Sequence, residues 1–449
     1  MRRVGLVLLG LLVAQVAAAT PFVPRDQLVE EMHPPARLAR STRPLATPAG
    51  AMAQLALLVE FEKKMQFATA CDGDAGTSTV CNFGGQIEVE SGPANMIIES
   101  DNTQEAIWDW SYYRRLTGQM GYAPQISNAF DYLSRFPGWN EWMDGGDPGP
   151  DYYSFYNCGW GVRAILEYEA ATGDTSHRGY GQMCADHITQ YAPGQAIAGL
   201  IDAAAQGWAA SGLWLWADAR GDAAGKQTAS TIGAHVKTWL DAFASRPAAT
   251  TWAVSGGAAF YGVVNSYLKD HPGELDGWVA QTAPHLGGWI DESMPTTGSW
   301  TDWRNAHNAW NMLAHFAAAR VLSGADADAH RQVALDIYDR LVAQDMADMD
   351  GGIPGSQQRP PTEDQSWITS YLAYFGIQEV IALGTPPPPD AGVDAPAPDA
   401  SGGSGGSGGS GAQDMSGCSC SFGPTRAASG ALVLGALALM ALGARRRRR

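Results

Sequence analysis

Helical segments recur with a period of about fifty residues between residues 50 and 384, and this repeat limits the chain to a small set of folds. Short turns that contain Gly or Pro, in most cases with Asp or Ser, recur at Gly118, Gly173, Gly221, Pro272 and Gly324. Gly and Pro end one helix, and Asp or Ser can cap the next. A near-constant period of this length predicts a repeated helical pair.

The helices on the two sides of these turns differ in composition. Those before the turns are rich in Ala, Trp, Leu and Tyr, whereas those after them carry more Asp, Arg, Lys and Gln, which predicts a buried inner layer and a solvent-facing outer layer. We expect inner helices at about residues 102–118, 159–173, 204–220, 256–270, 306–323 and 366–383. We expect outer helices at about residues 51–67, 123–136, 177–191, 223–246, 273–284 and 326–346. The first and last of these twelve helices can pair, which would close a ring.

This all-α arrangement resembles the (α/α)6 toroid of the six-hairpin glycosidases and related polysaccharide lyases. The resemblance is one of architecture over residues 51–384, and it implies a protein that acts on carbohydrate. No string of residues typical of a catalytic family accompanies it. Open helical solenoids and terpene-cyclase-like toroids have similar periods and stay open as alternatives.

The first fifty residues have the composition of an export signal followed by a disordered lead. Arg2 and Arg3 precede an apolar run, and three alanines that end at Ala19 form a small-residue cleavage site for signal peptidase. Residues 1–19 are therefore expected to be a signal peptide. Residues 20–50 are rich in Pro and have no apolar period, which is typical of a disordered segment.

The last part of the chain has a linker and then three successive features that indicate surface sorting. Residues 385–417 form a Pro-rich and then Gly/Ser-rich linker, which is followed by Cys418 and Cys420. Residues 427–444 carry no charge and are long enough to span a membrane, and five Arg follow them. This order resembles the MYXO-CTERM sorting signal of myxobacterial surface proteins. The resemblance implies processing by a sorting protease near these cysteines and retention on the outer surface of a bacterial cell, with a plain membrane anchor as the alternative.

Charge and cysteine content limit the partners and the compartment. A formal net charge of −17 repels phosphates and argues against a nucleic-acid partner. In an oxidising compartment, Cys71 and Cys81 are expected to form a disulfide that closes a short loop. Cys158 and Cys184 are expected at heights in a helical hairpin too different for a disulfide, so either this pair is reduced or the hairpin boundaries differ.

The connections from each outer helix to the next inner helix are long, and all of them must emerge on one face of a closed ring. Long loops in a compact domain are usually functional. The second and fifth of these loops combine aromatic and acidic residues, as a glycan cleft needs, because aromatic faces stack on sugar rings while carboxylates bind hydroxyls. We expect substrate contacts from Trp139, Trp142, Tyr152, Tyr153, Trp160, Arg163, Trp300, Trp303, Arg304 and Trp367.

Hydrolysis of a glycosidic bond needs two carboxyl groups, one protonated and one ionised. Asp302 is the first candidate, because aromatic and basic side chains surround it in the sequence. Its expected partner is Asp101, Glu105 or Asp144. Asp101 and Glu105 have an ordinary alternative role as residues of a helix N-terminus.

The stretch 303–310 supports a second enzyme class. Its Asn-His-aromatic pattern resembles that of toroidal alginate-lyase-type enzymes, which implies that His307 neutralises a uronate carboxylate while a Tyr such as Tyr156 removes a proton. A local patch of Arg163, Arg304 and Arg359 would have to offset the negative charge of the chain. A glycan-binding or cell-contact module without catalysis is the third alternative.

No metal or other cofactor is expected. The segments Asp72–Asp74 and Asp348–Asp350 resemble fragments of calcium loops, but neither has a closing Glu at the proper spacing, so calcium stays only an alternative. The sequence has no phosphate-binding loop, zinc-ligand spacing or nucleophile elbow, which leaves nucleotide enzymes and serine hydrolases without support.

Overall fold

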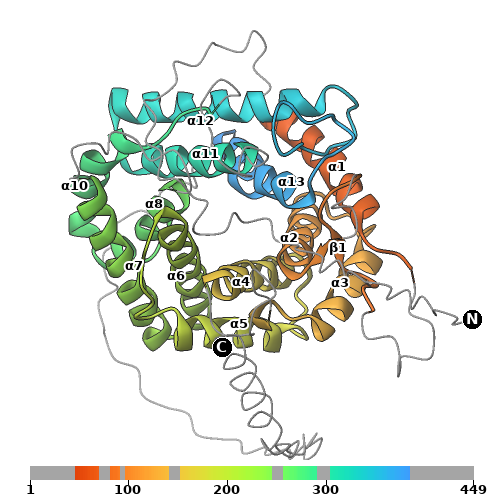
Figure 1. Ribbon diagram of the computed structural model, residues 1–449, viewed down its shortest axis with the longest axis horizontal. Coiled ribbons are helices and arrows are strands. Elements are labelled where there is room, and N and C mark those ends of the chain that lie inside the picture. Colours follow the sequence, from red (N-terminus) through yellow and green to blue (C-terminus); the bar gives the residue numbers. More distant parts are fainter. Residues whose placement is uncertain are drawn as a thin grey trace, which may run out of the picture. The chain divides into compact units, whose positions relative to one another are not determined.

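The computed structural model describes residues 46–69, 81–91, 97–140, 152–244, 256–290 and 304–384. These residues form an all-α (α/α)6 toroid, in which an inner layer of helices is surrounded by an outer layer (Figure 1). The predicted signal peptide, most of the disordered lead, the linker and the sorting signal lie outside the described residues and stay predictions.

The inner layer is a closed ring in which each helix packs against the next and α13 returns to α2. The π-helical segment η6 (Ala373–Ile377) and α14 (Gln378–Leu383) continue α13. The inner helices are α2 (Ser100–Thr117), α4 (Tyr152–Thr172), α6 (Leu200–Arg220), α8 (Gly256–Val264), α11 (Arg304–Val321) and α13 (Ser366–Leu372).

The outer layer confirms that the ring closes. Its first helix, α1, packs against α13, η6 and α14, the last inner segments of the chain (Figure 1). An open solenoid would keep these segments apart, so the solenoid alternative is wrong. The outer helices are α1 (Pro48–Met65), α3 (Ala123–Arg135), α5 (Arg178–Tyr191), α7 (Ala223–Ala244), α10 (Pro272–Thr282) and α12 (Gly324–Asp345).

The expected turn chemistry is present, but two boundaries differ. Gly118 and Gly221 end α2 and α6 in the left-handed conformation, with φ of 73° and 67°. Helix α4 begins at Tyr152 rather than near residue 159, because Tyr153 and Tyr156 have helical spacing with Trp160 and are buried with it. The fourth inner helix ends at Val264, and a separate turn of helix follows it.

Short elements occupy several connections. Strands β1 (Gln86–Ile87) and β2 (Ile98–Glu99) pair antiparallel just before α2, within the segment expected to be a loop. The others are η2 (Gly138–Asn140), α9 (Tyr267–Asp270) and η4 (Ala283–His285). The long-loop face is the side of the ring on which the inner helices begin; two connections from an outer to an inner helix, residues 192–199 and 346–365, are described in full.

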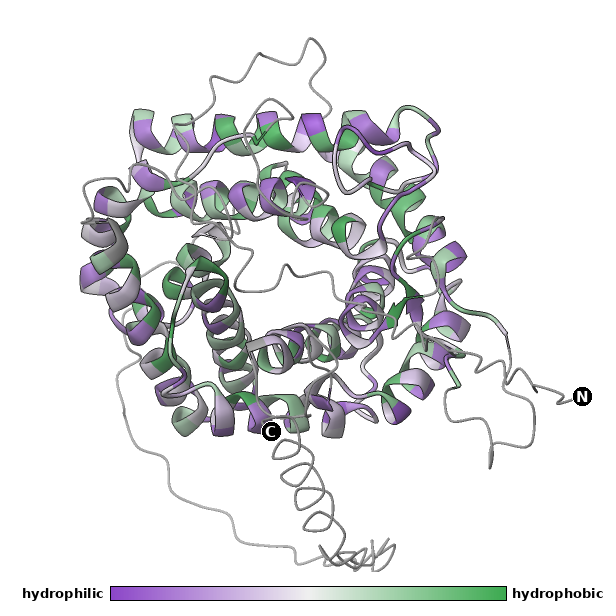
Figure 2. Cartoon of the chain, viewed as in Figure 1, coloured by the Kyte–Doolittle hydropathy of each residue, from purple (hydrophilic) through white to green (hydrophobic). Residues whose placement is uncertain are grey.

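The core lies between and within the two layers. Figure 2 shows strongly hydrophobic stretches on inner helices such as α6 and α8, and more hydrophilic residues on α2. Helices α6 and α8 approach closely at Gly207 and Gly262, where a Cβ added to Gly262 would lie 2.3 Å from Gly207 Cα. The hydrophilic character of α2 is the exception, because Ser100 to Tyr113 are all buried.

Among the described residues, no helix is long and apolar enough to cross a membrane; residues 427–444 are not among them. Cys71 is not described either, so its disulfide with Cys81 stays a prediction. Cys158 and Cys184 are free, buried thiols, and burial, with the neighbouring Cys184 thiol next in effect, raises the pKa of Cys158. The expected height difference between them is wrong, because Cys184 packs opposite Gly161, less than one helical turn from Cys158.

Candidate functional site

Three carboxyl groups line one side of α2. Asp101, Glu105 and Asp109 are four residues apart, which places them on the same helix face, and each is at most 1% exposed. Helix α2 begins immediately after β2, so Asp101 lies in its first turn, at the long-loop face. The N-terminal end of the helix dipole favours a negative charge at this position.

Glu62 on α1 and Glu88 beside β1 extend this row to five buried carboxyl groups, which we call the inner acidic cluster. Glu88 is fixed by its backbone, since its carbonyl accepts a 3.0 Å hydrogen bond from Ser366 N–H at the start of α13. No Lys or Arg in the described part of the chain forms an ion pair with any of the five. Burying so many acids without a cation is costly for folding, which makes the cluster a candidate functional site.

Asp101 is the member best stabilised as a carboxylate. Its Oδ2 accepts a 2.8 Å hydrogen bond from the Tyr153 hydroxyl, and its Oδ1 accepts one of 2.8 Å from Asn102 N–H. Burial raises the pKa of Asp101 to about 6, and these two hydrogen bonds oppose the rise. Asp101 is therefore mostly ionised at neutral pH.

Glu88 and Glu105, in contrast, favour the protonated form. Burial, followed by the negative charge of Asp101, raises the pKa of Glu88 to about 8. Burial, with the charge of Asp101 next in effect, holds the pKa of Glu105 well above its usual range, and neither Glu105 oxygen accepts a hydrogen bond from a described residue. The cluster therefore holds an ionised carboxylate close to protonated carboxyls at neutral pH, the division that acid–base catalysis needs.

The other two members are held by neutral donors. Glu62 accepts a hydrogen bond from the side-chain amide of Gln86, and Asp109 Oδ2 accepts one of 2.6 Å from the Ser370 hydroxyl. Burial raises the pKa of both carboxyl groups. Because these contacts join α1 to β1 and α2 to α13, they connect the parts of the chain at which the ring closes.

An aromatic floor adjoins the inner acidic cluster. The Tyr156 hydroxyl contacts that of Tyr371 and accepts a 3.3 Å hydrogen bond from Trp160 Nε1. Burial and then the charge of Glu105 raise the pKa of Tyr156 well above its usual range, so the floor and the cluster share an electrostatic environment. The aromatic floor consists of Tyr156, Trp160, Trp208, Trp310 and Tyr371.

The structure brings together some of the residues predicted from sequence. Asp101 and Glu105 belong to the inner acidic cluster, Tyr156 and Trp160 belong to the aromatic floor, and Tyr153 donates a hydrogen bond to Asp101. Trp367 packs edge-on against Tyr371 with ring centroids 5.4 Å apart, whereas Trp139 packs on Tyr180, an outer-layer residue, at 5.0 Å. Of Tyr152, only its place at the start of α4 is described. The remaining predicted residues lie outside the described residues: Trp142, Asp144, Trp300, Asp302 and Trp303.

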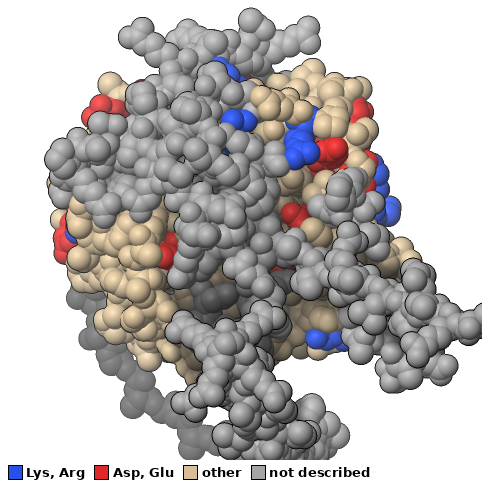
Figure 3. Space-filling model, in the orientation of Figure 1, with Lys and Arg blue, Asp and Glu red and all other residues tan. Residues whose placement is uncertain are grey.

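The basic patch expected for a uronate is not formed by the predicted arginines. Arg163 is buried in the interior, where it donates hydrogen bonds to Tyr374 and Ser211. Arg359 forms an ion pair of 3.0 Å with Glu363, and Arg304 is buried at the start of α11. On the part of the long-loop face that the structure describes, Figure 3 shows small groups of both charges and no broad basic area.

His307 is buried on α11, beside Trp310, with ring centroids 5.5 Å apart. Burial lowers its pKa to about 3, so its imidazole is neutral in the physiological range. A neutral His307 does not supply the positive charge that would balance a uronate carboxylate.

Sequence reasoning missed Glu62, Glu88 and Asp109. Asp109 could have been found, because it continues the four-residue spacing of Asp101 and Glu105 on a helix that is otherwise poor in charge. Glu62 and Glu88 carried no such signal, since only the folded ring brings α1 and the β1 segment against α2.

The chain is thus an (α/α)6 toroid with a group of buried acids on α1, on α2 and beside β1. No protein-family model matches the chain, and no curated protein matches it. Two similar solved structures are inactive variants of the α-1,6-mannanase GH76A of Salegentibacter sp. HEL1_6, with two consecutive aspartates replaced, in complex with α-1,6-mannotriose and α-1,6-mannotetrose. Their TM-scores are 0.51 and 0.50, at 12% identity, and each match covers 74% of this chain and 99% of the other. The likeness shows a shared fold.

Proposed function

We propose that this chain is a glycoside hydrolase. One observation carries the proposal: Asp101 and Glu88 belong to one buried cluster, yet their pKa values of about 6 and about 8 lie on opposite sides of neutrality. Pairs of carboxyls separated in this way supply a base and an acid from one site. The toroid shared with α-1,6-mannanases and the adjoining aromatic floor support the same class of substrate.

Within this proposal, Asp101 is the general base and Glu88 the general acid. The Asp101 carboxylate would activate water, and the Glu88 carboxyl would protonate the leaving oxygen. Side chains of the aromatic floor would stack on the sugar. The five acids of the cluster are at most 4% exposed, so binding of a sugar would require a conformational change that exposes them. Asp302 remains a further candidate carboxylate, to be tested as Asp302→Asn.

A substrate screen of the full chain tests the class. Neutral glycans, with α-1,6-linked mannan first, and polyuronates would be followed by new reducing ends and by absorbance of unsaturated products. On a neutral substrate that is cleaved, Asp101→Asn and Glu88→Gln should each lower turnover by about a hundredfold or more. Asp186→Asn, a change of the same charge on the exposed part of α5, is the control. Full activity in both cluster variants would contradict the assigned roles.

A glycan-binding module is the second candidate, and one observation favours it. The related mannanases are inactivated by replacement of two consecutive aspartates, whereas this sequence contains no two consecutive aspartates and Asp101 is followed by Asn102. If the wild-type chain binds a glycan without cleaving it and Asn102→Asp then cleaves it, the binding module is the correct class. Cleavage by the wild-type chain supports the hydrolase.

We also infer that the chain is exported and kept at the cell surface, from the compositions of residues 1–19 and 418–449. Signal peptidase and a sorting protease would be its processing partners. Replacing Cys418 and Cys420 by Ser should release the protein into the medium or misplace it, as measured by cell fractionation. Unchanged surface retention would instead indicate a plain membrane anchor.

A further inference from the structure

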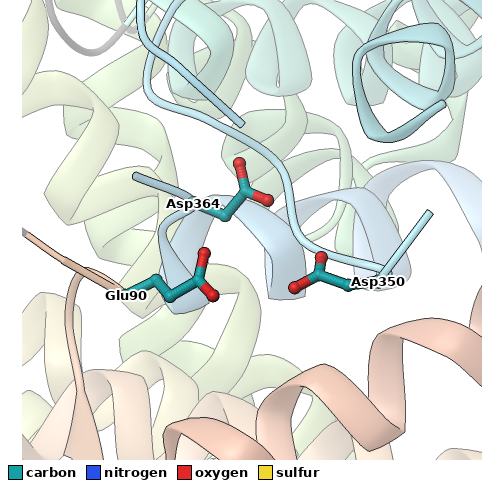
Figure 4. Close-up of side chains that lie close together, drawn as sticks. All are labelled: Glu90, Asp350 and Asp364. Atoms are coloured by element: carbon teal, nitrogen blue, oxygen red, sulfur yellow. The ribbon is translucent and has the colours of Figure 1, made fainter. Parts of the chain in front are cut away.

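A second group of acids lies on the long-loop face, apart from the inner acidic cluster. Glu90 follows the β1 segment, Asp350 lies in the loop after α12, and Asp364 immediately precedes α13. Figure 4 shows their carboxyl groups turned toward one common space, and one oxygen from each lies within 4.8 Å of the others. We call these three residues the loop acidic cluster.

Asp364 provides an independent indication of a ligand. Its side chain is 0% exposed, and neither carboxyl oxygen accepts a hydrogen bond. The backbone holds it in this position, because its carbonyl oxygen accepts a 2.9 Å hydrogen bond from Glu90 N–H. A buried carboxyl without a donor is costly unless a cation or another donor is bound there.

The spacing and the donor atoms fit calcium. Calcium binds oxygen ligands at about 2.3–2.6 Å, so two oxygens on opposite sides of one ion are separated by at most about 5 Å. Magnesium, at about 2.0–2.1 Å, requires a tighter shell, and zinc favours His and Cys ligands, which this cluster lacks. We propose that Glu90, Asp350 and Asp364 bind one calcium ion at the junction between the first and last helices of the ring.

Two neighbouring acids, Asp345 and Asp348, are not proposed as ligands. Both carboxylate oxygens of Asp345 accept hydrogen bonds, one of 2.7 Å from Gly351 N–H and one of 2.8 Å from the Gln54 side-chain amide. These bonds connect the loop to α1. Asp348 is exposed near the same place and adds to the negative field. The sequence does not reveal this arrangement, because Glu90 is far along the chain from Asp350 and Asp364, which lie near opposite ends of the connection between α12 and α13.

Lys64 on α1 lies beside the loop acidic cluster. Its ammonium group contacts Glu90 and lies 3.0 Å from Asp350 Oδ2, but it makes no hydrogen bond with Asp364. The Lys64 side chain is half exposed, so it can turn outward into solvent. It therefore competes with calcium for two of the three carboxylates, and its removal should strengthen calcium binding.

Calorimetric titration of the full chain with calcium chloride, after removal of cations with a chelator, tests the site. We expect saturable binding of one ion per chain and a rise in melting temperature that depends on calcium concentration. Asp364→Asn should weaken the affinity at least tenfold. Asp328→Asn, which removes the same charge from an exposed position on α12, should bind as the wild type does.

Lys64→Gln tests the same site without removing a ligand, and we expect it to bind calcium more tightly than the wild type by threefold or more. If Asp364→Asn does not fold, Glu90→Gln takes its place. Three results would overturn the proposal: no saturable binding by the wild type, unchanged affinity in the ligand variants, or magnesium binding as tight as calcium binding. None of these measurements depends on hydrolase activity.

Discussion

The hydroxyl of Tyr153 on α4 donates a 2.8 Å hydrogen bond to Oδ2 of Asp101 on α2, across the contact between two neighbouring inner helices. Both side chains are buried, with 0% and 1% of their surface exposed. Because burial alone favours the neutral acid, this bond is a main reason that Asp101 is ionised near pH 7. The assignment of Asp101 as a base therefore depends on Tyr153.

Tyr153→Phe should shift the acidic limb of the pH–rate profile upward. Loss of the hydrogen bond raises the pKa of Asp101 above about 6, so a higher pH is needed to ionise it, and a shift of about one pH unit is expected. The measurement is kcat/KM against pH on a glycan that the chain cleaves. Tyr168→Phe is the control, because that hydroxyl donates at the same distance to an exposed acid, Asp174, away from the cluster. If the acidic limb of the pH–rate profile does not move in Tyr153→Phe, ionisation of Asp101 does not control the rate.

Glu88→Gln should stabilise the fold at alkaline pH. The Glu88 carboxyl has an ordinary pKa of 4.5 and a pKa of about 8 in the fold, so between these values the folded state holds a proton that the unfolded state has lost. The free energy of unfolding therefore falls as pH rises through this window, at up to about 1.4 kcal/mol per pH unit. Gln cannot ionise and removes this dependence.

Urea unfolding at pH 5 and pH 8 measures this effect. The wild type should lose a few kcal/mol more than Glu88→Gln between the two values. The exposed Glu274→Gln should follow the wild type. Equal losses in the wild type and in Glu88→Gln would mean that Glu88 is ionised in the folded protein, and it could then not act as the acid.

The period of the turns was sufficient to predict the ring, because helix ends are set locally by Gly, Pro and capping residues such as those around Gly118 and Gly221. The predicted start of α4 was wrong because packing against the core, and not a local signal, sets it. A Gly- and Pro-rich stretch precedes Tyr152, and only packing against the core explains why Tyr153 and Tyr156 are helical.

The site was harder to predict than the fold. Asp101 and Glu105 could be identified from their place at the start of an inner helix. Glu88 could not, because its position depends on a backbone hydrogen bond with Ser366, far away in the sequence. The charge of Arg163 indicated a surface patch, but its guanidinium is stacked over Trp208 in the interior, 3.5 Å from the ring centroid.

Gly262→Ala should destabilise the fold, because the new Cβ would lie 2.3 Å from Gly207 Cα and the two helices would have to separate. A loss of about 1–3 kcal/mol in the free energy of unfolding is expected, as measured by urea titration. Gly277→Ala in α10 is the matched control: nothing lies within 4 Å of its Cβ, and a gain of about 0.5–1 kcal/mol is expected from helix propensity. A neutral Gly262→Ala would show that α6 and α8 do not pack as closely as described.

Tyr156→Phe separates hydrolysis from elimination. A Tyr that acts as a base needs a pKa near the working pH, but burial and the charge of Glu105 move the pKa of Tyr156 in the opposite direction. Its hydroxyl is also engaged with Tyr371 and Trp160. We therefore expect Tyr156→Phe to lower the rate of glycan cleavage by less than tenfold, with no unsaturated ends formed by either protein. If Tyr156→Phe and His307→Ala instead abolish the formation of unsaturated ends on a polyuronate, the chain is a lyase and the roles proposed for Asp101 and Glu88 are wrong.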